Sequence, residues 1–471
     1  MFTIEGREYP FYGPQTRRNF FRSIGWGMGG LTLANLLRAE AAAGIGSSHK
    51  AVINIHLDGG PPHQDMIDLK PDAPAEIRGL FKPIQTRIHG YSICEHLPKL
   101  AMMADRIAFI RSLVGSADAH DAFQVQSGFK EIDLKSIGGR PALGSVVSRL
   151  KGPTTSEIPA FVDLMQGRPF VRNSARPGFL GQSYQPFRPD ISKLFKRELE
   201  PGMVKELSKL GPEHATQLSL PPSLSAQRVF DRIRLRNQID EMQSALDKSI
   251  SAMSLDTFSQ QAVQMLTSGR FAKAMDLSQE DPEILDRYTL KNAGQKKPFQ
   301  TADGPDAVRK FLLARRLVEA GVRCVSLSIS DFDTHSDNFG RMQQVLPILD
   351  HGLATLIEDL EERGMLQNVS IVVWGEFGRS PRIDSANAGR NHWPQVGMAM
   401  LAGGGIRAGQ VIGSTDKDAA SAHSRPVHVQ EIFATLYHNL GIDPASTFLE
   451  DPSGRPQPLL QFSSPLAELV G

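Results

Sequence analysis

Residues 331–340, DFDTHSDNFG, carry side chains that could bind a metal ion directly after a predicted buried strand. They contain three aspartates and one histidine, and they follow the apolar run GVRCVSLSIS. Asp333 and His335 are two positions apart, so on an extended segment both side chains point to one side. A carboxylate and an imidazole presented together are typical ligands of a divalent ion. The stretch is therefore either a polar turn or the rim of a metal site.

Similar side chains follow three other predicted strands, AVINIHL (51–57), IAFIRSL (107–113) and NVSIVVWG (368–375). Such groups at one sheet edge repel each other unless a cation lies among them. Zinc accepts imidazole nitrogen and carboxylate oxygen together, and manganese, magnesium or calcium are alternatives, as one ion or two. The candidate metal ligands are Asp58, His63, Asp333, His335, Glu376 and His392. Arg379 and Arg390 could bind the oxyanion of a phosphate or sulfate ester with their forked guanidinium groups.

Each candidate also has a structural alternative. Asp65, Asp68 and Asp337 are interpreted as turn or helix-capping residues. His392 precedes Trp393-Pro394 and could instead be packed in a core. The remaining histidines in helix faces, strands and generic loops are interpreted as structural; they are His49, His56, His89, His96, His214, His351 and His438.

The positions of these side chains depend on a predicted α/β fold with a central, mostly parallel sheet flanked by helices. Strand-like runs alternate with amphipathic runs such as AVRKFLLARRLVEAGV (307–322), and the carboxyl ends of parallel strands share one edge. Residues from about 165 to 300 have helical periodicity in their second half and are predicted to form a mostly helical insertion that covers one edge of the sheet.

Residues 1–46 are predicted to be an export signal, and residues 47–471 the folded domain. The segment TRRNFFR (16–22) precedes a short, glycine-rich apolar run and then RAEAAAG. Paired arginines in this arrangement resemble a twin-arginine signal, so the predicted partner is the twin-arginine export machinery and the predicted location the periplasm or beyond. The signal is cleaved near Ala43 or kept as an anchor; the alternative is an amphipathic helix that stays on the folded protein. No later stretch is long and apolar enough for a transmembrane helix.

The overall composition argues against nucleic acid as a binding partner and against a disulfide framework. Lys and Arg number 52 against 51 Asp and Glu, so no net charge favours nucleic acid. Cys94 and Cys324 are the only cysteines, and both lie in or beside apolar stretches, which predicts two buried thiols rather than a disulfide framework.

Several motifs together resemble the bacterial domain-of-unknown-function family 1501, which is common in planctomycetes and belongs to the alkaline-phosphatase/sulfatase superfamily. They include LDGGPPHQDMIDLKP, RPALGSVVSRLKG, DFDTHSDNF, EFGRSPRI with GRNHWP, and IFATLYHNLGIDP, and the resemblance runs from about residue 50 to 465. It implies a dinuclear metal site at the carboxyl edge of the sheet. Asp58 matches the ligand of one metal, Asp333 and His335 match the ligands of the other, and His392 matches the distal histidine.

The resemblance also departs from the superfamily pattern at two places. The usual D-H-G block is Glu376-Phe377-Gly378 here, which keeps the carboxylate and lacks the histidine. The sulfatase block C/S-x-P-x-R is absent. VGSADAHDAFQVQSG stands where phosphatases carry their nucleophile, which makes Ser116 the candidate by position, with His120 as a ligand or a replacement nucleophile. Attack by a metal-bound hydroxide is the other route.

Two hypotheses about function follow. The first is an exported, metal-dependent hydrolase of phosphate or sulfate esters, acting on a small-molecule or polysaccharide substrate. The second is a catalytically silent binding or scaffold protein on the same fold, which recognises sulfated polysaccharide at the cell envelope.

Overall fold

The computed structural model describes residues 2–4, 7–9, 49–120, 122–135, 137–165, 174–189, 191, 268–291 and 303–470. The predicted twin-arginine pair and most of the predicted helical insertion lie outside these residues. Within them, no helix is both long and apolar enough to cross a membrane.

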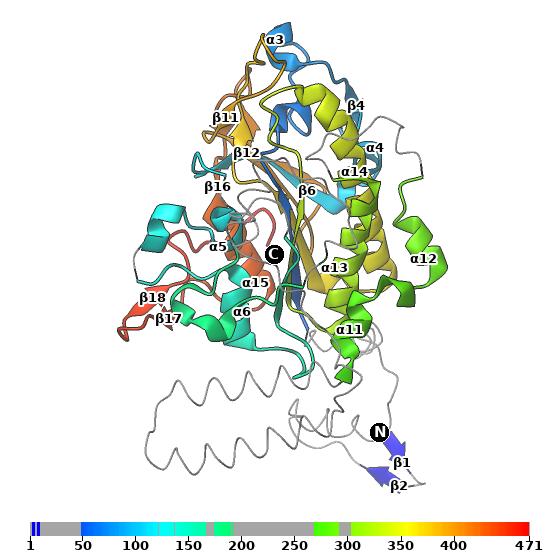
Figure 1. Cartoon of the computed structure of the whole chain (residues 1–471), viewed down its shortest axis with the longest axis vertical. Helices are drawn as coiled ribbons and strands as arrows, with labels where there is room; N and C mark the ends of the chain where they lie inside the picture. Colours follow the sequence, from blue (N-terminus) through cyan, green and yellow to red (C-terminus); the bar gives the residue numbers. More distant parts are fainter. Residues whose placement is uncertain are drawn as a thin grey trace.

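The described core is built on one eight-stranded sheet with helices on both faces (Figure 1). The strand order is β13-β6-β12-β9-β3-β8-β7, with β16 also paired to β6. The strands are β3 (Ala51–Leu57), β6 (Ile107–Val114), β7 (Phe161–Asp163), β8 (Cys324–Ile329), β9 (Val369–Trp374), β12 (Gly397–Gly403), β13 (Gln410–Ile412) and β16 (Val427–His428). β3, β7, β8 and β9 are mutually parallel, which confirms the predicted mostly parallel α/β sheet.

β12 is the exception, because it runs antiparallel to both of its neighbours, β6 and β9. The chain leaves β9 at the carboxyl edge and forms the short antiparallel pair β10 (Gly378–Arg379) and β11 (His392–Trp393). It then enters β12 from that same edge. The amino end of β12 therefore lies where the parallel strands end, and His392 reaches that edge although it precedes a strand.

The helices divide between the two faces of the sheet. On one face lie α4 (Pro98–Met102), α13 (Val308–Ala320) and the long α14 (Asn338–Glu362). On the other lie α5 (Phe123–Ser127), α6 (Leu143–Lys151) and α15 (Val429–Asn439) (Figure 1). Successive strand residues alternate between the two cores, as a pleated strand requires: Ile53 and Ile371 belong to the first, Val52 and Val372 to the second. Both cysteines are buried free thiols, as predicted.

Smaller elements surround this core. They are β1 (Phe2–Ile4) with β2 (Arg7–Tyr9), α3 (Ala75–Arg78), β4 (Pro83–Gln85) with β5 (Ser92–Cys94), α11 (Arg270–Met275), α12 (Pro282–Arg287), β14 (Ser414–Thr415) with β15 (Ala422–Ser424), and β17 (Phe448–Glu450) with β18 (Pro456–Pro458).

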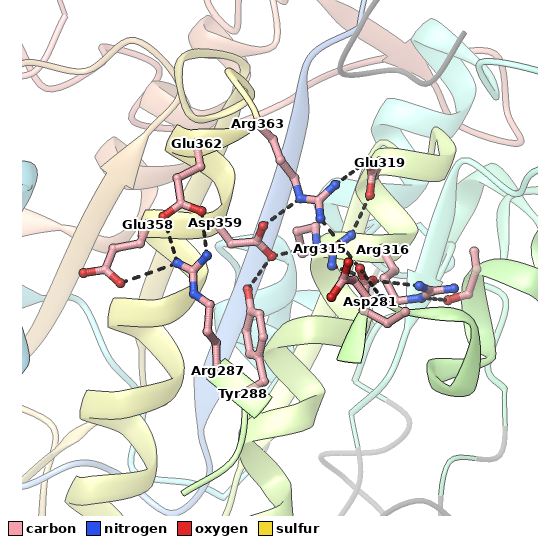
Figure 2. Close-up of polar contacts among 12 residues, drawn as sticks. Asp281, Arg287, Tyr288, Arg315, Arg316, Glu319, Glu358, Asp359, Glu362 and Arg363 are labelled. Carbon is pink, nitrogen blue, oxygen red and sulfur yellow. Dashed lines mark hydrogen bonds and ion pairs between the residues drawn. The ribbon is translucent and has the colours of Figure 1, made fainter. Parts of the chain in front are cut away.

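A buried ion network joins α13, α14 and the segment that carries α12 (Figure 2). Arg315 of α13 is 1% exposed, and its Nε donates to Asp359 Oδ2 of α14 at 2.9 Å. Its Nη2 donates to Glu280 at 2.6 Å. Tyr288 and Arg363 donate to the two oxygens of Asp359, at 3.0 and 2.6 Å. The network therefore fixes the described end of the insertion region against the helical layer.

We expect Asp359→Ala to lower the free energy of unfolding by about 3–5 kcal/mol, because it leaves the buried Arg315 charge with less compensation. Arg287→Ala is the matched control. It removes an exposed ion pair with Glu362 in the same region, and it is expected to cost less than about 1 kcal/mol. Denaturant unfolding of both variants measures the difference, and equal costs would contradict the expectation.

His49, just before β3, gives the fold a pH dependence. It is 3% exposed, and burial, followed by the charge of Arg323, lowers its pKa from 6.5 to about 3. Above pH 6.5 the His49 side chain is neutral in both the folded and the unfolded state. Below pH 6.5 it takes up a proton only in the unfolded state, so the free energy of unfolding falls with falling pH until about pH 3. Between pH 6.5 and 4 this amounts to about 3 kcal/mol. His49→Leu should lose this part of the pH dependence, as urea unfolding at several pH values would show; parallel profiles for the two proteins would contradict it.

Candidate metal centre

Seven acidic and histidine side chains form two adjacent groups at the carboxyl edge of the sheet. The ligand atoms of the first group all lie within 4.8 Å of one another, and so do those of the second. The first group is His120, Asp333, His335 and His392, and the second is His56, Asp58 and Glu376. The structure thus brings together six of the residues singled out from the sequence, namely Asp58, His120, Asp333, His335, Glu376 and His392.

In the first group, two imidazoles face each other with the same ring atom. His335 Nε2 lies 3.0 Å from His392 Nε2 and 3.2 Å from Asp333 Oδ1. The opposite nitrogens have partners that accept a proton: His392 Nδ1 lies 2.8 Å from Asp118 Oδ1, and His335 Nδ1 lies 3.2 Å from Asn391 Oδ1. Donation from Nδ1 to these oxygens would leave both Nε2 atoms, 3.0 Å apart, as electron-pair donors. This is the arrangement of imidazoles that bind a shared cation.

His120 connects the two groups. Its Nε2 lies 3.3 Å from Asp333 Oδ1, and its Nδ1 lies 3.0 Å from Glu376 Oε1. Burial lowers the pKa of His120, but hydrogen bonds to the two carboxylates and their charges outweigh it and raise the pKa to about 9. For His392, burial and the neighbouring positive charges lower the pKa in spite of Asp118.

The second group is more deeply buried. His56 and Asp58 are two positions apart at the end of β3, so both side chains lie on one side of the strand. His56 is fully buried, neither of its ring nitrogens makes a hydrogen bond, and its Nε2 lies 3.5 Å from Glu376 Oε2. Burial raises the pKa of Glu376, but hydrogen bonding to His120 and the charges of His56 and His120 lower it below its usual value. Glu376 also accepts the backbone N–H of Gly59 at 3.0 Å.

Gly59 allows the chain to pass between the two groups. Its φ is +115°, and a Cβ there would lie 2.2 Å from the backbone nitrogen of Asp333. Only glycine combines this conformation with so close an approach. The residue therefore sets the separation between the end of β3 and the DFDTH loop.

Arg379 and Arg390 do not have the role expected from the sequence. Both are fully buried. Arg379 donates to the carbonyl oxygen of Gly60 at 3.0 Å and to Asp333 Oδ1 at 2.6 Å, and Arg390 forms a forked ion pair with Asp65 at 2.7 and 2.8 Å. The expectation that they bind a substrate oxyanion is therefore corrected: Arg379 positions Asp333, and Arg390 holds the backbone of the neighbouring loops.

Two other predicted site residues are not part of either group. His63 is fully buried, its Nε2 lies 3.1 Å from the carbonyl oxygen of Ala419, and burial lowers its pKa. Ser116 is half-buried in the loop after β6, and α5 begins only at Phe123, so Ser116 is not at a helix N-terminus. Asp337, predicted to be structural, is the N-cap of α14 and accepts the N–H of Gly340.

The donor set of both groups fits a divalent metal. The first offers three imidazoles and one carboxylate, which suits zinc, and the second offers one imidazole and two carboxylates, which suits zinc or manganese. The unpartnered nitrogens of buried His56 are the strongest sign, because a buried polar atom without a partner is costly unless a ligand satisfies it.

Three contributors to the site were missed from the sequence. His56 was interpreted as structural, although its spacing from Asp58 is the same two-residue spacing that singled out Asp333 and His335. Asp118, in the loop after β6, and Asn391 were given no role. Their contacts with His392 and His335 span 274 and 56 residues, and no local pattern predicts such pairs.

Fold and site together define an α/β protein with clustered metal-type ligands at the carboxyl edge of a mostly parallel sheet. The chain belongs to the family described as protein of unknown function (DUF1501), which matches it over residues 49–470. This confirms the family resemblance seen in the sequence. No curated protein matches the chain.

Several solved structures are distantly similar. The PsFucS1 sulfatase from Pseudoalteromonas sp. has 12% identity and a TM-score of 0.36, over 87% of this chain and 71% of that one. The C-terminal periplasmic domain of EptC from Escherichia coli, in complex with Zn, has 9% identity and a TM-score of 0.35, over 84% and 83%. The phosphonate monoester hydrolase SpPMH from Silicibacter pomeroyi has 12% identity and a TM-score of 0.31, over 84% of this chain and 73% of that one. Similarities this distant define neither the site nor the activity of the chain.

Proposed function

We propose that this protein is an exported, metal-dependent hydrolase of phosphate or sulfate esters. The observation that carries the proposal is the convergence of seven potential ligands in two adjacent groups joined by the 3.0 Å contact between His120 and Glu376. His120, Asp333, His335 and His392 would hold one divalent ion and His56, Asp58 and Glu376 a second, and ions held there would supply the positive charge that phosphoryl or sulfuryl transfer requires.

The remaining residues position these ligands. Asp118 fixes the ring of His392 through Nδ1, Asn391 does the same for His335, and Arg379 holds Asp333 from the buried side. Glu376 orients His120 through its Nδ1. These contacts hold the ligand atoms in place before substrate arrives, which reduces the reorganisation that the reaction requires.

Water activated at the metal centre is favoured over Ser116 as the attacking group. Ser116 lies in the loop before α5, which begins at Phe123, so it does not stand at the N-terminus of that helix, where backbone N–H groups would favour a bound anion. His120, with Nε2 near Asp333, is the residue of that loop that reaches the centre.

The proposal is tested by metal analysis of the purified protein and by hydrolysis of aryl phosphate and aryl sulfate before and after chelation. We expect bound zinc or manganese, and activity on one ester class that chelation removes and metal restores. A folded protein with neither metal nor hydrolysis would refute the proposal.

Asp118→Ala tests the orientation of His392. Loss of a partner behind a metal-bound histidine typically lowers metal affinity by about 10–100-fold, and we expect that loss here. The side chain is 61% exposed, so folding should not suffer. Metal titration in competition with a chelator measures the affinity, and an unchanged value would remove Asp118 from the site.

A catalytically silent binding protein is the second candidate. It is favoured by the burial of Arg379 and Arg390, which leaves the oxyanion without the expected guanidinium partners. Tight binding of a sulfated glycan without turnover, unaffected by Asp333→Ala, would support it over the hydrolase.

A further inference from the structure

Residues 115–120 bring two side chains to the metal centre, and we call them the His120 loop. They follow β6 and belong to no helix or strand, so no regular hydrogen-bond ladder fixes their course. The loop nevertheless has to place His120 between two carboxylates and Asp118 beside His392, each at hydrogen-bonding distance. Ligand atoms must be held to a fraction of an ångström for tight metal binding, so the loop needs support from elsewhere in the fold.

The side chain of Gln124, in the first turn of α5, supplies such support. Its Nε2 donates to the carbonyl oxygen of Gly115 at 2.6 Å, and its Oε1 accepts the backbone N–H of Ala117 at 3.0 Å. The residue is only 3% exposed. One amide therefore satisfies a carbonyl and an N–H of the loop, as a backbone peptide group would. Turning the amide over would set oxygen against oxygen and N–H against N–H, so the two partners fix its orientation.

The helix that carries Gln124 is itself tied to the rest of the fold. Asn54 of β3 donates to the carbonyl oxygen of Val125 at 2.7 Å, and its Oδ1 accepts Trp374 Nε1 of β9 at 2.8 Å. At the other end of α5, Gln430 of α15 donates to the carbonyl oxygen of Gly128 at 2.9 Å. All three bonds are buried. Gln124 thus connects the His120 loop to β3, the strand that also carries His56 of the second ligand group.

The start of the His120 loop is shaped by a glycine. Gly115 has a φ of +95°, and a Cβ there would lie 2.5 Å from His428 Nε2. Only glycine combines this conformation with so close an approach, so the turn out of β6 packs directly on His428. The Gln124 amide spans the next two residues. Together the two contacts set the direction in which the chain runs towards Asp118 and His120.

We propose that Gln124 is a positioning residue of the metal centre, which holds the His120 loop where Asp118 and His120 reach the first ligand group. The inference rests on the proposed function, because it requires that a metal ion binds there. Gln124 touches none of the ligand atoms, and it acts through the backbone of Gly115 and Ala117 alone.

Gln124→Met tests the proposal, with Gln126→Met as the matched control. Methionine has a similar length and volume, carries no N–H donor and is only a weak acceptor. Gln126 lies two residues further along α5 and is 1% exposed, but its amide contacts Met165 and Ser326 instead of the His120 loop. Both variants lose buried hydrogen bonds, so denaturant unfolding should show similar losses of stability. Only Gln124→Met should disturb the metal centre.

Co²⁺ is the probe for the centre, since its visible absorption reports the number and kind of ligands. In Gln124→Met the affinity of one Co²⁺ ion should fall about tenfold, as is typical when a group that orients a ligand is lost. The absorption of that ion should change as well, because water replaces His120. Gln126→Met should bind Co²⁺ with the wild-type affinity and spectrum.

Hydrogen exchange of the metal-free protein gives a readout that needs no metal. The amide of Ala117 is bonded to Gln124 Oε1, so deuterium uptake in residues 115–120 should be faster in Gln124→Met and unchanged in Gln126→Met. Wild-type Co²⁺ affinity and spectrum in Gln124→Met would overturn the inference and leave the proposed function standing. A wild-type protein that binds no Co²⁺ would instead refute the metal centre itself, and this inference with it.

Discussion

Asp333→Asn should lose the metal of the first group and nearly all hydrolytic activity. Asp333 Oδ1 lies within 3.3 Å of Nε2 of both His120 and His335, and it is the carboxylate of that group. The amide has almost the same shape, so the change removes charge with little change in volume. A bound metal contributes several kcal/mol to the transition state, and its loss should lower kcat/KM by roughly 10³-fold.

Asp337→Asn is the matched control, because it makes the same chemical change four residues later in the same loop. Asp337 caps α14 through Gly340, and asparagine is an equally good N-cap residue. This variant should keep its metal and its activity. Metal content by mass spectrometry and steady-state kinetics of both variants make the comparison. Full metal occupancy and activity in Asp333→Asn would rule out the proposed centre.

Local sequence patterns were enough to predict the sheet and most of the residues that meet at its carboxyl edge. Mostly apolar runs of six to eight residues mark β3, β6, β8 and β9, because strands covered by helices on both faces are largely buried. The parallel arrangement then implies that residues after those strands meet at one edge, as Asp58, His120, Asp333 and Glu376 do. The family resemblance matched two of these residues, Asp58 and Asp333, to metal ligands, together with His335 and His392.

Contacts between distant segments account for what the sequence could not predict. The direction of β12 depends on its pairing with β6 and β9, and its own residues, GMAMLAG, suit either direction. Arg379 was expected to bind a substrate oxyanion because a forked guanidinium group suits a phosphate or sulfate ester. In the fold, the carbonyl oxygens of Gly59 and Gly60 and the carboxylate of Asp333 surround its guanidinium group. No local pattern separates an arginine that positions a ligand from one that binds substrate.

His56 and His63 are both buried histidines, but their surroundings differ. Both are fully buried, and both have a ring nitrogen without a hydrogen bond. Only His56 lies in a group with two carboxylates, and the D-H-G histidine that the family resemblance led us to expect is missing from Glu376-Phe377-Gly378. In the D-H-G block the histidine directly follows the carboxylate residue. Here His56 brings an imidazole to Glu376 from β3 instead.

We therefore expect His56→Leu to bind one metal ion where the wild type binds two, and His63→Leu to keep both. Stability gives a second readout that does not depend on activity. An ion present at about a thousand times its dissociation constant stabilises the folded state by about 4 kcal/mol, so the stabilisation that added metal brings should shrink by that amount in His56→Leu alone. Each variant is compared with its own chelated form, so packing changes caused by the substitution cancel. Two bound ions in His56→Leu would show that this histidine is structural and that the second ion is held by Asp58 and Glu376 without it.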